Sequence, residues 1–120
     1  MDLNKMIQAF KNHPDYSKMG MIASHVGVVR GTSLNGQRVT GIEVSFDKKT
    51  IDKIVSEIKG MPGIVQVAVE TFGGHLNIGD EVMAVAVGGD TREHVFPALI
   101  SFVDRIKKEA CTKKEFFVTV

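Results

Sequence analysis

The segment EVMAVAVGG, residues 81–89, is almost continuously apolar and constrains the fold more than any other stretch of the chain. It is far too short to cross a bilayer as a helix, which takes about 20 apolar residues. A short run of this kind is typical of a central strand that other elements cover on both faces. The segment therefore predicts a sheet with further layers packed against it.

Hydrophobic periodicity predicts the elements around this strand. The predicted helices cover residues 3–10, 51–58 and 95–110, and the other predicted strands cover residues 21–30, 38–46, 63–72 and 115–120. Asn35-Gly36, between the first two of these strands, is a strong β-hairpin signal. The Gly-Gly pairs 73–74 and 88–89 are expected to be turns. The order of elements indicates an α/β or α+β domain with two layers.

Length and charge narrow the class of protein. With 120 residues, the chain is expected to form one domain, residues 1–120. A net charge of +1 gives no global field to attract nucleic acid or a membrane, so any basic site must be local. The polar, amphipathic start does not resemble a signal peptide, and a cytoplasmic protein is expected.

Metal and disulfide chemistry are not expected. Cys111 is the only cysteine, which rules out an internal disulfide. The four histidines have no metal-type spacing with one another or with Cys111, so we expect no metal site.

Basic residues near the end of the long predicted helix differ in orientation. At about 100° per residue, Lys107 lies on the shoulder of the apolar face, whereas Arg105 and Lys108 lie on the opposite side and are expected to face water. If the helix continued, Lys114 would lie on the same shoulder of the apolar face as Lys107. Lys107 could simply extend its stem over apolar surface with its ammonium in solvent. Alternatively, it could stand beside a pocket and act as acid, base or nucleophile, and periodicity does not choose between the two.

Two arginines occupy predicted loops. Arg30 ends a strand, and Arg92 lies between the central strand and the long helix. A guanidinium at such a position suits phosphate or carboxylate, although each residue could equally be an ordinary surface arginine. Because of Pro97, two starts of the helix are possible: one near His94, and one with Asp90 as the cap and a kink at the proline.

The stretches ASHVGVVRG and GGHLNIGDEVMAVAVGGDTREHVFPALISFVDRIKKEACTKKE together resemble the large subunit of molybdopterin synthase, a MoaE-like family. The likeness rests on a strand ending in Gly-x-Val-Arg, a G-x-L-x-x-G-D-x-V turn and strand, an arginine that opens a helix, and a Lys-x6-Lys pair. It covers about residues 23–115, and Phe96 and Asp104 also fall on family positions.

This resemblance implies a dimer of hammerhead-type α/β domains with a mostly antiparallel sheet. Each protomer would accept the Gly-Gly tail of a small ubiquitin-like subunit that carries a thiocarboxylate. Sulfur would pass from that tail to cyclic pyranopterin monophosphate and build the dithiolene of molybdopterin, without a cofactor. By the same resemblance Lys107 is the catalytic lysine, Lys114 assists it, and Arg30 and Arg92 hold anionic groups of the substrate.

The chain departs from the family pattern at several places, among them Thr91 and the segment ACTKK. Thr91 stands where the family has a histidine, and we therefore place it among the predicted substrate-binding residues. The segment ACTKK lacks the proline and the aromatic residue that the family carries before its second lysine. These departures leave open a second reading, a paralogue that binds a ubiquitin-like partner or a pterin without turnover. A small ligand-binding or regulatory domain of unrelated origin is a third.

Overall fold

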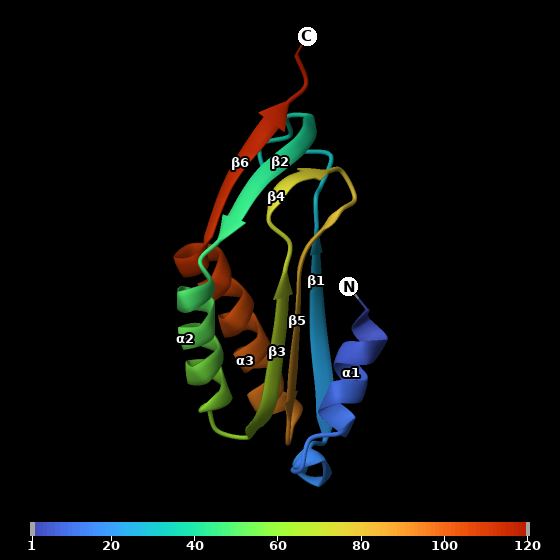
Figure 1. Ribbon diagram of the computed structural model, residues 1–120, viewed down its shortest axis with the longest axis vertical. Coiled ribbons are helices and arrows are strands. Elements are labelled where there is room, and N and C mark those ends of the chain that lie inside the picture. Colours follow the sequence, from blue (N-terminus) through green and yellow to red (C-terminus); the bar gives the residue numbers. More distant parts are fainter. Residues whose placement is uncertain (1, 120) are drawn as a thin grey trace.

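The computed structural model describes residues 2–119 and contains two small sheets arranged along one long axis (Figure 1). The helical elements are α1 (Leu3–Lys11), the short 3-10 helix η1 (Tyr16–Lys18), α2 (Lys48–Lys59), α3 (Arg92–Arg105) and the π-helix η2 (Ile106–Ala110). The strands are β1 (Met21–Val28), β2 (Val39–Phe46), β3 (Ile64–Thr71), β4 (Gly74–Asn77), β5 (Glu81–Gly89) and β6 (Cys111–Phe117). None of the helices in this part of the chain is long and apolar enough to span a membrane.

The first sheet has the strand order β1-β5-β3, with every pair antiparallel. The apolar segment 81–89 is its central strand, which confirms the prediction from the sequence. Helices α2 and α3 cover one face, and α1 lies against the other (Figure 1). Gly88 permits the approach of α1, since a Cβ there would lie 2.9 Å from the Phe10 ring. The Gly-Gly pair 88–89 is thus part of a strand, and the prediction of a turn there is wrong.

The helices of this layer form where the sequence places them. Asp2 and Asp47 cap α1 and α2, each accepting hydrogen bonds from two backbone N–H groups of the first turn. The apolar face predicted for the last helix is confirmed, with Val95, Phe102 and Ile106 all fully buried. Arg92 is the first residue of α3 and Thr91 is its N-cap, so neither of the two predicted starts is correct.

The second sheet has the order β4-β2-β6 and is also antiparallel. It extends the molecule beyond the first sheet, to overall dimensions of 55 × 25 × 24 Å (Figure 1). Its own small core consists of Val29, Val39, Ile42, Val44 and Leu76. The fold is therefore the predicted α+β class with antiparallel strands, but it has two sheets and two cores.

The expected hairpin between β1 and β2 is wrong as a pairing of strands. The turn itself forms, because Gly36 adopts a φ of 87° and one isolated bridge joins Thr32 to Arg38. Beyond that bridge, β1 pairs with β5 and β2 pairs with β4 and β6. Local turn chemistry sets the reversal of the chain, whereas burial of each apolar face decides which strands pair.

The end of the chain also differs from the prediction. β6 begins at Cys111, four residues earlier than the predicted strand 115–120. β4 was not predicted at all, because the Gly-Gly pair at 73–74 indicated a turn there. At four residues β4 is too short for a pattern of alternation to be recognised in the sequence.

Candidate active site

A cavity of about 760 Å³ lies at the junction of the two sheets, and we call it the junction cavity. Its walls come from the end of β1 and the loop that follows, the start of β5, strands β2 and β6, and the π-helix η2. Apolar side chains such as Val44 and Met83 form part of its lining. Its charged lining residues are Arg30, Lys107, Lys113 and Glu115, so the cavity is net positive.

Lys107 reaches this cavity from η2. It follows the fully buried Ile106, which anchors this turn in the core of the first sheet. Its side chain is exposed at the cavity surface, so the ammonium is hydrated and still faces a pocket. Lys107 is therefore both exposed to solvent and part of a cavity lining.

Arg30 lines the same cavity from the loop after β1, two residues after the strand ends. Its Nε donates a hydrogen bond to the Thr32 carbonyl oxygen at 3.2 Å, which holds the guanidinium at the start of the loop. The sequence-predicted pair Arg30 and Lys107 is therefore brought together, although the two residues are 77 positions apart in the chain.

Lys114 lies on the other face of the second sheet. The chain leaves the helix at Cys111, so the assumption that Lys114 returns to the shoulder of Lys107 on a continued helix is wrong. In β6 the side chains alternate, and Cys111, Lys113 and Glu115 line the cavity. The Lys114 ammonium instead lies 5.4 Å from the centroid of the Phe116 ring.

Arg92 and Thr91 lie at the far end of α3 from Lys107. Fifteen residues of helix separate Arg92 from Lys107, a distance of about 22 Å along the axis. Arg92 is exposed and its Nε lies 3.5 Å from a carboxylate oxygen of its neighbour Glu93. The Thr91 side chain makes no capping hydrogen bond to the helix. A single chain therefore does not bring these two residues to the junction cavity.

His25 is a residue whose position the sequence analysis missed. Its Nε2 is buried and has no hydrogen-bond partner among residues 2–119. Burial lowers the pKa of the imidazole, and the positive charge of Lys107 lowers it further. Alternation along β1 places His25 on the same face as Met21 and Ala23, which pack against the main core, and that pattern could have placed it toward η2.

Cys111 also lines the junction cavity. Burial raises the pKa of its thiol, and the nearby charges of Lys113 and Lys107 act in the opposite direction. Both lysines are thus close enough to the thiol to influence its ionisation. Among residues 2–119 no three metal-ligating side chains gather, here or elsewhere.

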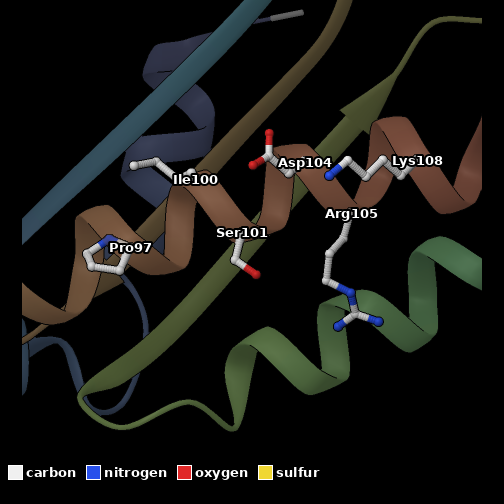
Figure 2. Close-up of a pocket in the computed structure, with 6 residues that line it drawn as sticks. All are labelled: Pro97, Ile100, Ser101, Asp104, Arg105 and Lys108. Atoms are coloured by element: carbon white, nitrogen blue, oxygen red, sulfur yellow. The ribbon is translucent and has the colours of Figure 1, made fainter.

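A second, shallower hollow of about 470 Å³ lies on the outward face of α3 (Figure 2). Pro97, Ile100, Ser101 and Asp104 form its floor, and Lys108 borders it. Figure 2 shows Arg105 turned away from Asp104 and toward α2, where it forms an ion pair with Glu57. Arg105 is therefore bound to protein, contrary to the expectation that it faces water. Arg105 and Lys108 also line the hollow beside Asp104, so its lining is less positive than that of the junction cavity.

The family model described as MoaE protein matches residues 1–109. The chain belongs to the MoaE family. The family model and the shared fold confirm the family that the resemblance predicted. This MoaE protein belongs to molybdenum cofactor biosynthesis, and its fold is that of molybdopterin synthase. No curated protein sequence matches the chain.

Solved structures share the fold of this MoaE protein. Molybdopterin cofactor biosynthesis protein E from Burkholderia multivorans is 29% identical, with a TM-score of 0.76 over 98% of this chain and 81% of that one. Molybdopterin synthase from Staphylococcus aureus is 24% identical, with a TM-score of 0.73 over 86% and 78% of the two chains. A complex of subunits 1 and 2 of molybdopterin-converting factor from Helicobacter pylori matches at 17% identity, with a TM-score of 0.69 over 99% and 85%.

Proposed function

We propose that the chain transfers sulfur from the thiocarboxylated C-terminus of a small ubiquitin-like subunit to cyclic pyranopterin monophosphate, forming the dithiolene of molybdopterin. The observation that carries the proposal is the meeting of Arg30 and Lys107 in one cavity. These are residues that the resemblance assigns to the substrate and to the chemistry. The chain would act as one domain of this type over residues 1–120, in the cytoplasm.

The charges of the cavity suit both reactants. A thiocarboxylate and a phosphate are anions, and guanidinium and ammonium groups bind such anions through charge-assisted hydrogen bonds. The Lys107 ammonium can also donate a proton while sulfur is transferred, because it lies at the cavity surface. Arg30, in the lining of the same cavity, would hold an anionic group of the pterin.

The small subunit would enter across an apolar rim. Val28, Leu34 and Phe117 line the junction cavity and are exposed, with Leu34 at 96% exposure. Exposed apolar side chains around a concave site favour a protein contact. The Helicobacter pylori relative was solved as a complex of two subunits of molybdopterin-converting factor. We propose a corresponding complex for this chain, with the tail of the partner inserted toward Lys107.

We further propose that the working form is a homodimer. Arg92 and Thr91 cannot reach the junction cavity of their own chain, because they lie at the start of α3 and Lys107 lies in η2, beyond its other end. If they bind the same substrate, they must come from a second copy. A mixture of Lys107→Ala and Arg92→Ala proteins tests this arrangement: two inactive variants should regain part of the activity when they form mixed dimers, and no recovery would contradict it.

The central experiment is a reconstitution. Purified protein would be mixed with the thiocarboxylated small subunit and cyclic pyranopterin monophosphate, and molybdopterin would be assayed. Lys108→Ala is the matched control for Lys107→Ala, because Lys108 borders the outward face of the helix and lies outside the junction cavity. We expect product with wild type and Lys108→Ala, and a loss of about 100-fold or more with Lys107→Ala.

The paralogue without turnover remains the second candidate. The observations that favour it are Thr91 in place of the family histidine and Lys114 on the far face of the second sheet. Tight binding of the small subunit without any product would support it. If the small subunit does not bind and no product forms, both candidates are contradicted.

A further inference from the structure

We infer that Lys113, rather than Lys114, is the second lysine of the junction cavity, and that it binds an anionic group of a reactant together with Lys107 and Arg30. This inference rests on the proposed function for the identity of the reactant, but not for the site itself. The anion is a phosphate or a thiocarboxylate, which share the same chemistry of recognition.

The register of the second sheet determines which lysine faces the cavity. In the β2–β6 ladder, Lys113 lies opposite Val44 and Lys114 lies opposite Glu43. Residues directly opposite each other in antiparallel strands share a face. Val44 lines the junction cavity, whereas Glu43 is exposed on the other side and contacts His75, with 3.7 Å between its carboxylate oxygen and the imidazole Nδ1.

Lys114 has its own partners on that outer face. Its ammonium lies over the Phe116 ring, and the same ring contacts His75 at 5.6 Å between centroids. To bring Lys114 into the cavity, β6 would have to slip by one residue, which turns every side chain of the strand to the opposite face.

Contacts at both ends of β6 oppose such a slip. At the start of the strand, the Asp47 N–H donates to the Ala110 carbonyl oxygen at 2.8 Å. At its end, the Val118 N–H donates to the Arg38 carbonyl oxygen at 3.0 Å. The half-buried Cys111 also packs against the core of the second sheet. The register that points Lys113 inward is therefore held from both sides.

The charges around Lys113 leave it available for a ligand. Among residues 2–119, neither Lys107 nor Lys113 forms an ion pair with a carboxylate. Glu115 is the one carboxylate in the lining described above, against three cations. Cations gathered in one concave site repel each other, and a bound anion relieves that repulsion.

The family comparison does not decide between the two lysines. The match to the family model ends at residue 109, before either of them. The Lys-x6-Lys spacing assigns Lys114 only by counting residues, and between the two lysines the chain passes through a π-helix and into a strand. Adjacent residues of a strand point to opposite faces, so an offset of one residue decides which of the two lysines faces the cavity.

Matched variants of the full chain test the inference without the partner. Inorganic pyrophosphate would be titrated into wild type, Lys113→Gln, Lys114→Gln and Lys113→Arg, with amide chemical shifts as the readout. We expect binding to weaken about tenfold in Lys113→Gln, to be retained in Lys113→Arg and to be unchanged in Lys114→Gln. Thermal melts of all variants would verify that they fold.

The opposite pattern, with Lys114→Gln as the defective variant, would overturn the inference. So would the absence of pyrophosphate binding to wild type. In the reconstituted reaction, a raised KM for the pterin in Lys113→Gln identifies the phosphate as the anion, and weaker binding of the thiocarboxylated subunit identifies the tail. If pyrophosphate binds through Lys113 but no molybdopterin forms, the proposed reaction fails and the anion site stands.

Discussion

Arg105 on α3 forms an ion pair with Glu57 on α2 and so joins the two helices that cover the first sheet. The same guanidinium is also bound by Glu109, with 2.7 Å between Nε and the carboxylate. The hydrogen bonds that its guanidinium donates to the carboxylates of Glu109 and Glu57 raise the pKa of Arg105 above its ordinary value. One arginine therefore links α2, α3 and η2, and η2 carries Lys107.

Removing this link should lower thermal stability moderately. In Glu57→Gln the interhelical pair loses its charge, and we expect the Tm to fall by a few degrees at low salt. The difference should shrink in high salt, because both side chains are partly exposed and the interaction is screened. Glu70→Gln, an exposed carboxylate on β3, is the control. Equal melting of the two variants would contradict a structural role for the pair.

Stability should decrease in mild acid because of His25. Its pKa in the folded protein is below the ordinary value of 6.5, so the unfolded chain takes up the proton first as the pH falls. Stability is therefore complete above pH 6.5 and decreases below it. His25→Leu should remove this dependence in thermal melts between about pH 7.5 and 5.

Lys107→Met tests the cause of the His25 shift. Without the nearby ammonium, the pKa of His25 in an NMR titration should move part of the way back toward 6.5, since burial is the larger cause and remains. An unchanged pKa would show that Lys107 does not act on the imidazole.

The core beneath α3 should be sensitive to truncation. Phe102 is 0% exposed, and Phe102→Ala should cost about 3–5 kcal/mol in the free energy of unfolding. Ile100, on the outward face of the same helix, is 61% exposed, and Ile100→Ala should change that free energy by about 0.5 kcal/mol or less. Denaturant unfolding of both variants measures the contrast, and similar losses would contradict the orientation of α3.

The contact of α1 with the first sheet depends on Gly88. A Cβ at this position would lie 2.9 Å from the Phe10 ring of α1, so Gly88→Val should destabilise the protein by about 1–3 kcal/mol and loosen α1. Hydrogen exchange of the α1 amides would show the loosening. Gly31→Ala is the matched control, since its nearest neighbour would be 3.9 Å away. Unaltered exchange in Gly88→Val would contradict the packing described for α1.

Glu115 opposes anions in the junction cavity because it lies on the same face of β6 as Lys113. Glu115→Gln removes a negative charge from the lining, and the affinity for pyrophosphate should rise several-fold. Glu43→Gln, on the other face of the sheet, should leave the affinity unchanged. A rise in both variants would indicate a general effect of net charge instead of a local one.

The sequence by itself determined the elements whose physical signal is local. The apolar run 81–89 required a buried central strand, and the spacing of Val95, Phe102 and Ile106 was sufficient to orient the last helix. The family was also recognisable, since motif order and spacing are linear properties of the chain. Arg30 and Lys107 could be selected in this way, although nothing local showed that they would meet.

Only the tertiary structure decided which strands pair and which lysine enters the cavity. A turn at Asn35-Gly36 reverses the chain, but the two apolar cores draw β1 and β2 into different sheets. A continued helix predicted that Lys114 would lie on the same side as Lys107. The π-helix instead ends at Ala110, and in the strand that follows it is Lys113 that lines the cavity. The reason is that strand pairing and register depend on contacts between distant segments, which no local pattern contains.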